Sequence, residues 1–203
     1  MKLIVFGATG KTGRHVCRIA LDQGHEVTAF TRSPHKIERA AGLRVAQGNV
    51  LDATAVADAI PGHDAAIVAL GSTGLRDGTT LATGTSHVVD GMTRHAVERL
   101  VVLSAAGVGE SWNQVSLLAR VMFGTLLRNI LADHTAQEAL VRDSTLDWTL
   151  VRAAVLHDGP AANDVTATNT EQMDRIARAD LAAFLVQEAR DGAYRRQAIA
   201  VTS

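Results

Sequence analysis

A glycine-rich loop near the start of the chain constrains its fold more than any other feature. Gly7, Gly10 and Gly13 recur at every third residue, directly after an apolar run at residues 3–6. An amphipathic stretch at residues 11–23 follows at once, so the loop joins a buried strand to a helix. Glycines there allow a tight turn and let the helix pack closely on the strand. The segment therefore predicts the first strand–helix unit of a parallel sheet.

The rest of the chain repeats this alternation of short apolar runs and longer amphipathic stretches. Strands are predicted at residues 3–6, 26–31, 44–46, 65–70, 100–104 and 148–151, and helices at residues 11–23, 34–41, 53–60, 80–98 and about 115–143. The tail adds a β-leaning segment at residues 164–170, a helix at 178–189 and a last strand at 197–201. Near-continuous apolar strands separated by helices indicate right-handed βαβ units. We expect an α/β protein with a Rossmann-type, doubly wound parallel sheet, helices on both faces and a small C-terminal addition on the substrate side.

Length and composition are typical of one domain that spans residues 1–203. Hydrophobic residues make up 47% of the 203 residues, which is ample for a core. The formal net charge is −1 and aromatic residues make up 3%, so neither a basic surface nor a stacking platform for nucleic acid is expected. The part from about residue 152 to 203 is expected to complete the substrate cleft.

Cysteine usage and apolar run lengths bear on location. Cys17 is the one cysteine, so no internal disulfide can form, which fits a reducing cytoplasm. No apolar stretch reaches the ~20 residues of a membrane span, and the run at residues 3–6 is too short for a signal peptide. We expect a cytoplasmic monomer or small homo-oligomer without membrane or nucleic-acid partners.

The glycine loop also has the chemistry of a phosphate-binding turn. Free backbone N–H groups and the positive end of the helix dipole can point at an anion there. Gly10-Lys11-Thr12 resembles the end of a P-loop, but that pattern needs a glycine five residues before Gly10, where Val5 stands. The loop therefore favours a dinucleotide over a triphosphate. Its candidate contacts are Gly7, Thr9, Gly10, Lys11, Thr12 and Gly13.

Short motifs at the ends of the predicted strands resemble the atypical branch of the short-chain dehydrogenase/reductase superfamily. The likeness is carried by Gly7-Ala8-Thr9-Gly10-Lys11-Thr12-Gly13, Phe30-Thr31-Arg32-Ser33, Gly48-Asn49-Val50-Leu51-Asp52, Ala69-Leu70-Gly71-Ser72, Leu103-Ser104-Ala105-Ala106-Gly107, Leu146-Asp147-Trp148-Thr149-Leu150-Val151-Arg152 and Arg178-Ala179-Asp180-Leu181-Ala182. Within this branch the order is similar to NAD(P)H-binding reductases of the biliverdin-IXβ reductase (flavin reductase) type, and more distantly to NmrA-like proteins. The resemblance implies a nicotinamide dinucleotide held also by Asn49, Val50, Leu70, Gly71, Ser72 and Ser104.

Charges after the second predicted strand favour NADP(H) over NAD(H). NAD-preferring sites place an acid there to hold the ribose 2′-hydroxyl. This chain has Arg32 and Ser33 instead, with Lys36 one turn later. An arginine can grip a 2′-phosphate with two hydrogen bonds. The alternative is that these are solvated basic residues.

The usual proton donor of short-chain dehydrogenases is missing. That donor is a Tyr-x-x-x-Lys pair, whereas the one tyrosine, Tyr194, is followed four places later by Ala198. Reduction of a conjugated acceptor needs less, because the cofactor supplies hydride and solvent can supply the proton. The resemblance implies catalytic roles for Ser104, near the nicotinamide, and for His134, which matches a pocket histidine. The family pattern has Thr then Ser at that strand end, where this chain has Ser104 then Ala105, and His134 can alternatively be a surface helix residue.

The sequence thus predicts an NADPH-dependent reductase that transfers hydride to a small planar acceptor such as a flavin, a quinone or a bilin-like molecule. No metal is expected. The alternative is a non-catalytic NADP(H) sensor of the NmrA-like kind. Residues 107–116 are expected to form a loop over the cleft, with Trp112 either covering the acceptor or only anchoring the loop. Asp180 is expected to cap or charge the start of a helix.

Overall fold

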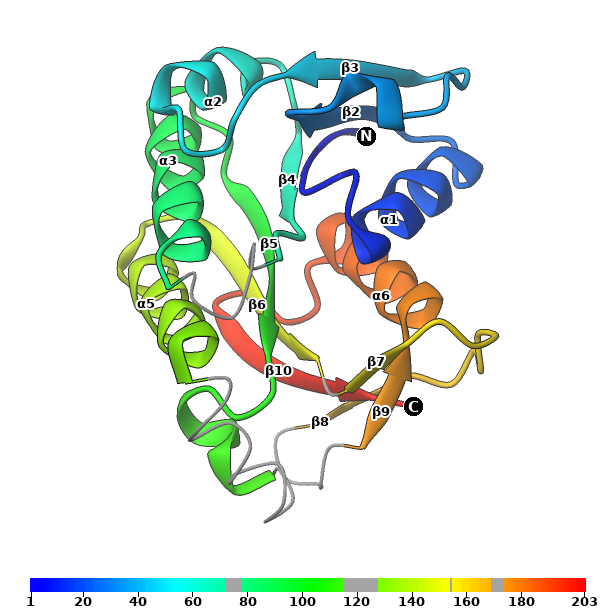
Figure 1. The fold of residues 1–203 in the computed structure, drawn as a ribbon, viewed down its shortest axis with the longest axis vertical. Coiled ribbons are helices and arrows are strands. Elements are labelled where there is room, and N and C mark those ends of the chain that lie inside the picture. The colour runs from blue at the N-terminus through cyan, green and yellow to red at the C-terminus, as the bar shows by residue number, and fades with distance from the viewer. Residues whose placement is uncertain (72–77, 115–127, 154, 169–173) are drawn as a thin grey trace.

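A central sheet with helices on both faces makes up the protein (Figure 1). The computed structural model describes residues 1–71, 78–114, 128–153, 155–168 and 174–203. Within these ranges the sheet has eight strands in the order β3-β2-β1-β4-β5-β6-β10-β8. The strands are β1 (Lys2–Phe6), β2 (Glu26–Thr31), β3 (Leu43–Gln47), β4 (Ala65–Val68), β5 (Arg99–Ala105), β6 (Asp147–Ala153), β8 (Thr166–Thr168) and β10 (Gln197–Thr202). Only β8 at one edge runs antiparallel, against β10, so the predicted doubly wound Rossmann-type fold is confirmed.

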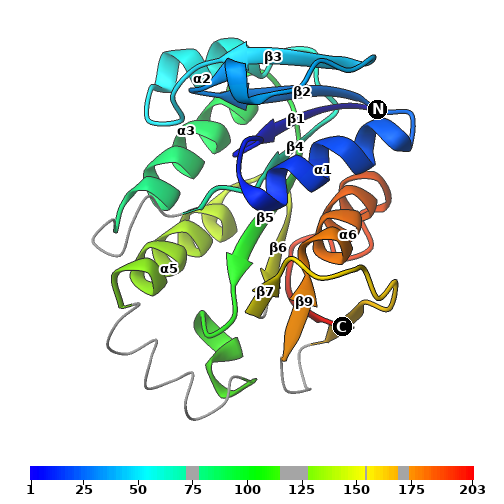
Figure 2. The same cartoon turned by 45° about the vertical axis from the view of Figure 1, so that its right-hand side comes forward.

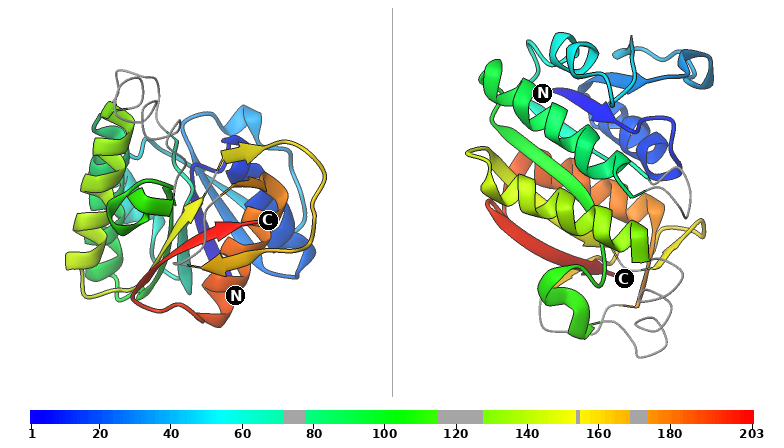
Figure 3. Two further views of the ribbon diagram at one scale, coloured as in Figure 1. Left: turned by 90° about the horizontal axis from the view of Figure 1, so that it is seen from below. Right: turned by 60° about the vertical axis from the view of Figure 1, so that its left-hand side comes forward.

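Among the described residues, two helices cover one face of the sheet and three cover the other (Figures 2 and 3). The first pair is α1 (Lys11–Asp22) beside α6 (Arg178–Asp191). The other face carries α2 (Ala53–Ala59), α3 (Thr80–Arg94) and α5 (Arg128–Asp143), which lie side by side in that order. No helix in the described ranges has the length and apolar character needed to cross a membrane.

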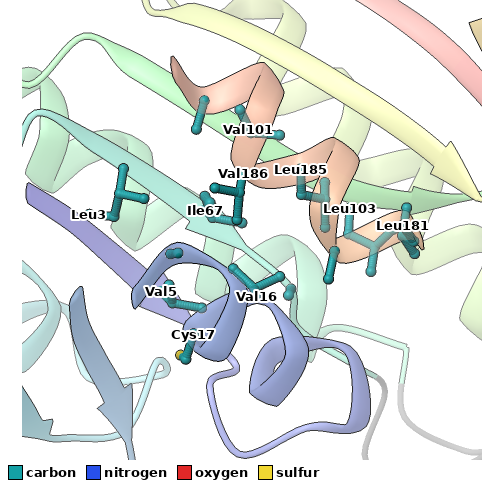
Figure 4. Packing of buried hydrophobic residues seen from close by; sticks show 14 of the residues in the cluster. Leu3, Val5, Val16, Cys17, Ile67, Val101, Leu103, Leu181, Leu185 and Val186 are labelled. Atoms are coloured by element: carbon teal, nitrogen blue, oxygen red, sulfur yellow. The ribbon is translucent and has the colours of Figure 1, made fainter. Parts of the chain in front are cut away.

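Alternation along the strands splits the core into two clusters. Leu3 and Val5 of β1 face α1 and α6, whereas Ile4 and Phe6 face the three helices of the opposite layer. Successive strand side chains point to opposite faces, so a strand buried on both sides reads as an unbroken apolar run. Figure 4 shows the first cluster, in which Cys17 packs below Val5 and Val16. Burial raises the pKa of the Cys17 thiol to about 12, as suits an unreactive core residue.

The chain reverses its direction of travel across the sheet at β1. It moves from β1 through β2 to β3, and then returns to the other side of β1 to add β4, β5 and β6. In such sheets the loops beyond the carboxyl ends of the strands separate at this point and leave a crevice. The glycine loop after β1 lies there.

Two glycines of the loop are required by packing. Gly7 has φ +85°, and a Cβ on it would lie 2.3 Å from the carbonyl oxygen of Ala69. A Cβ on Gly13 would lie 2.2 Å from the carbonyl oxygen of Gly7. The predicted tight turn and close helix packing are thus both present. Gly10 is less crowded, since its nearest neighbour would be the same Gly7 oxygen at 3.1 Å.

Some local predictions were wrong. The helix expected at residues 34–41 is only a three-residue 3-10 helix, η1 (Pro34–Lys36). Most of this segment is exposed, and Ile37 is its one side chain packed on the core, so no apolar stripe supports a longer helix. A small parallel sheet of β7 (Val155–His157) and β9 (Arg175–Ala177) was not expected at all. Of the helix expected at about residues 115–143, the part before α5 lies outside the described residues.

Alanine at Gly13 should lower the free energy of unfolding by about 1–3 kcal/mol, because backbone must shift to admit the new Cβ. Gly10→Ala is the matched control, with a nearest contact of 3.1 Å instead of 2.2 Å. Urea unfolding of both variants measures the difference. An equal loss in the two would contradict the packing role of Gly13.

Candidate functional site

Two adjoining cavities form a cleft along the carboxyl ends of the central strands. The first has a volume of about 530 Å³ and lies between the glycine loop and the ends of β2 and β3. The second has a volume of about 300 Å³ and lies beyond the ends of β5 and β6. Both are lined by Gly10, Ala69, Leu70 and Gly71, so the glycine loop and the end of β4 lie where the cavities meet.

Residues after β2 and β3 line the first cavity. Arg32 lies there together with Asn49 and Val50, as expected of a pocket for the adenosine half of a dinucleotide. The side-chain oxygen of Asn49 accepts a hydrogen bond from the backbone N–H of Leu51 at 3.2 Å. That bond leaves the Asn49 side-chain NH₂ available for a ligand. The cavity is therefore lined by an arginine and by an amide donor, both on exposed residues.

The predicted phosphate and ribose contacts divide into three groups. Gly7, Thr9, Gly10, Lys11 and Thr12 line one or both cavities. Gly13, Ser33 and Lys36 do not line either one: Gly13 packs against Gly7, and Lys36 is exposed in η1. Ser72 lies outside the described residues.

Ser104 and His134 come together at the second cavity. Ser104 lies near the carboxyl end of β5, and His134 is on α5; both line the cavity and are nearly buried, with 3% and 9% of their surface exposed. The rest of the cavity wall combines apolar side chains with small and charged residues from the glycine loop and α6. The apolar residues are Leu70, Leu103, Ala153 and Leu156. His134 is therefore not a surface residue.

A buried ion pair supports Ser104 from behind. Ser104 Oγ donates to Glu138 Oε1 at 2.8 Å. Arg152 donates to both Glu138 oxygens, from Nε at 2.9 Å and from Nη2 at 2.7 Å. Glu138 and Arg152 are 3% and 2% exposed. A fork-to-fork pair of this kind keeps the carboxylate ionised despite its burial.

The same arginine reaches the segment that follows β5. Arg152 Nη2 also donates to Glu110 Oε2 at 2.7 Å, and Glu110 belongs to the 3-10 helix η2 (Gly109–Gln114). This hydrogen bond lowers the pKa of Glu110. The arginine thus ties η2 to the floor of the second cavity. The side chain of Trp112, expected over the cleft, lies outside the described residues.

Glu138 and Arg152 were missed in the sequence analysis. Glu138 lies four residues after His134 on a predicted helix, hence on the same helix face. Arg152 is a charged residue at the end of an otherwise apolar strand. Together these signals could have suggested a buried pair, because charged residues are rarely buried without a partner.

His134 is held in one protonation state by its surroundings. Its Nδ1 lies 3.1 Å from the side-chain oxygen of Gln137, and Gln137 Nε2 donates to Thr85 Oγ1 at 2.9 Å. Burial lowers the pKa of His134, and the hydrogen bond to Gln137 only partly opposes this. The imidazole is therefore neutral at pH 7, which disfavours it as a ready proton donor.

An exposed carboxylate links the glycine loop to the C-terminal part. Lys11 Nζ and Arg178 Nη1 lie 2.8 Å and 2.6 Å from the two oxygens of Asp158. Hydrogen bonds from Lys11 and the charge of Arg178 lower the pKa of Asp158. Both cations line the second cavity, so its mouth carries more positive than negative charge.

Asp180 charges the first turn of α6, one of the two expected roles, but it does not cap the helix. Its oxygens instead accept from the backbone N–H groups of Ala162 and Asn163 at 2.8 and 3.1 Å. The helix begins without a side-chain cap. Asp180 therefore anchors the loop before β8. Among the described residues no group of three His, Cys, Asp or Glu side chains could hold a metal ion.

Comparison with known proteins decides the family. The family described as NAD(P)H-binding matches residues 7–192. The chain belongs to this NAD(P)H-binding family. The match includes the glycine loop and both cavities, and it confirms a nicotinamide dinucleotide as the cofactor.

Relatives of this NAD(P)H-binding protein include oxidoreductases. Oxidoreductase stcQ of Emericella nidulans is 26% identical over an alignment of 224 residues, gaps included. The alignment covers 97% of this chain and 81% of the relative. Among solved structures, the anaerobillin reductase ChuY of Escherichia coli O157:H7 has a TM-score of 0.81 at 24% identity, covering 100% of this chain and 97% of that one. A short-chain dehydrogenase/reductase of Veillonella parvula in complex with NADP has a TM-score of 0.85 at 15% identity, with 100% and 94% coverage. The chain is an NAD(P)H-dependent oxidoreductase, and the predicted resemblance is confirmed.

Arg152→Met should lower the free energy of unfolding by about 3–5 kcal/mol, because it removes the two-point partner of a buried carboxylate and leaves Glu138 only the more distant Arg142 as a counter-charge. Arg142→Met is the matched control. Arg142 approaches the same two carboxylates, Glu110 at 3.2 Å and Glu138 at 3.6 Å, but its side chain is 36% exposed. Its loss should cost at most about 1 kcal/mol. Chemical denaturation compares the two, and similar losses would show that the buried pair is dispensable.

Proposed function

We propose that the protein is an NADPH-dependent reductase that transfers hydride to a small planar acceptor such as a flavin, a quinone or a bilin-like molecule. The observation that carries the proposal is the continuous cleft, which runs from Arg32 past the glycine loop to Ser104 and His134. A dinucleotide laid along it would have its adenosine in the first cavity and its nicotinamide at the second. The acceptor would then stack on the nicotinamide against the apolar wall.

The residues at the second cavity support hydride transfer without a protein acid. The cofactor supplies hydride when bound, and the chain lacks the Tyr-x-x-x-Lys pair that protonates an alkoxide. His134 is neutral, and the Ser104 hydroxyl donates its hydrogen bond to Glu138. A conjugated acceptor spreads the incoming charge over its ring system and can take its proton from water. Proximity and orientation would then supply much of the rate.

Parts of the chain beyond residue 152 complete this site. Ala153, Leu156 and Arg178 line the second cavity, together with residues from the glycine loop and β5. ChuY is a reductase, which is consistent with the proposed reaction, and the Veillonella protein binds NADP, which is consistent with the proposed cofactor.

Arg32→Ala should weaken NADPH binding about tenfold or more, because a charge-assisted hydrogen bond to the 2′-phosphate is worth ~1.5–3 kcal/mol. NADH, which lacks that phosphate, should bind the variant and the wild type alike, and the wild type should prefer NADPH. Arg39→Ala, an exposed arginine outside both cavities, is the control. Titration calorimetry with both cofactors is the measurement. Equal affinities of the wild type for NADPH and NADH would contradict the role of Arg32 in binding the 2′-phosphate.

Ser104→Ala and His134→Ala should each reduce turnover only about two- to tenfold, the value of one orienting hydrogen bond. A true general acid would be worth ~10²–10⁴-fold. NADPH oxidation with a panel of flavins, quinones and bilins, at several pH values, separates the two. A hundredfold loss in His134→Ala with an abolished pH dependence would make His134 the acid. Tight NADPH binding without turnover of any acceptor would favour the sensor instead.

A further inference from the structure

The proton of Ser104 is committed to Glu138. Glu138 is ionised by the two-point contact with Arg152 at 2.9 and 2.7 Å, and an ionised carboxylate can only accept hydrogen bonds. Ser104 must therefore donate across the 2.8 Å contact with Glu138. A serine hydroxyl has one proton and two lone pairs, so what remains for a ligand is an acceptor.

His134 also offers a hydrogen-bond acceptor to a ligand. In the structure Gln137 Nε2 donates to Thr85 Oγ1 at 2.9 Å, and the Gln137 side-chain oxygen faces His134 Nδ1 at 3.1 Å. An amide oxygen only accepts, and Nδ1 therefore carries the imidazole proton. Because burial keeps this histidine neutral, its other nitrogen, Nε2, is unprotonated.

We propose that Ser104 Oγ and His134 Nε2 select a ligand that presents N–H groups at the second cavity, and that Glu138 and Gln137 are the positioning residues that set this polarity. For the acceptor, the inference rests on the proposed function. A ligand that turned only carbonyl oxygens toward these lone pairs would leave buried acceptors unpaired and meet repulsion. The N–H groups can come from two sources: the carboxamide of the nicotinamide or a ring N–H of the acceptor.

Matched ligand pairs test each source by binding, without turnover. For the acceptor, lumiflavin is compared with 3-methyllumiflavin, which lacks the one N–H of the oxidised ring, on protein saturated with NADP⁺. For the cofactor, NADP⁺ is compared with its 3-acetylpyridine analogue, in which a methyl ketone replaces the carboxamide. Fluorescence quenching and calorimetry give the dissociation constants.

The wild type should prefer the N–H-bearing member of at least one pair by about tenfold, the cost of leaving a buried acceptor unpaired. The pair that shows the preference identifies the source. Less than twofold discrimination in both pairs would overturn the inference. If neither flavin binds, the cofactor pair alone decides, and a lack of turnover would count against the proposed function only.

Variants of the positioning residues separate polarity from stability. Gln137→Met keeps Ser104 and His134 but frees the imidazole to place its proton on either nitrogen, so the preference in the affected pair should fall to about threefold or less. Glu138→Gln should lower the preference in the same way, through Ser104. If Glu138→Gln fails to fold, Gln137→Met alone tests the positioning role. Gln187→Met, an exposed glutamine on α6, is the control and should keep the full ratio. A purely structural role would weaken both members of a pair equally and leave the ratio unchanged, which would refute the positioning role.

Discussion

The cleft depends on one close backbone contact, between the first turn of α1 and the loop that follows β1. A Cβ at Gly13 would lie 2.2 Å from the carbonyl oxygen of Gly7, and one at Gly7 would lie 2.3 Å from the carbonyl oxygen of Ala69. Helix, loop and the end of β4 therefore meet without side chains between them. This brings the N-terminus of α1, with its free N–H groups, to the place where the two cavities join. In the proposed function a pyrophosphate would lie against this N-terminus, and the two ends of the dinucleotide would extend into the two cavities.

A second constraint acts at the far end of the cleft, where charge is buried. Removing Glu138 and Arg152 from water is costly, and a well-packed apolar pair of similar volume would often be as stable. What the ion pair adds is direction: it holds the carboxylate ionised and turns the Ser104 hydroxyl toward it. Gln137 and Thr85 do the same for His134 with neutral groups. Two side chains that could each donate or accept are thereby given one defined role.

Local pattern was enough for most of the fold and for the glycine loop. The strands buried on both faces and the glycine loop depend on neighbours close in sequence, and both were predicted. The helix predicted at residues 34–41 was wrong because a helix needs an apolar stripe, and Ile37 alone does not provide one. The pairing of Glu138 with Arg152 joins a helix to a strand 14 residues away. The contacts of Asp180 with Ala162 and Asn163, and the pairing of β7 with β9, likewise arise only from tertiary packing. No periodicity in the sequence encodes such partners.

The C-terminal part keeps its place over the cleft through packing more than through charge. Its helix α6 lies against α1 in the first core cluster, with Leu181, Leu185 and Val186 fully buried. In the bridge from Lys11 through Asp158 to Arg178, 71% of the Lys11 side chain and 58% of the Asp158 side chain are accessible, whereas the Arg178 side chain is 17% accessible. Exposed ion pairs contribute little stability, so Lys11 can exchange Asp158 for an anionic group of a bound ligand at small cost. The rigid contact between α1 and α6 therefore sets the geometry of the cleft, while its mouth retains positive charge that can adapt to what enters.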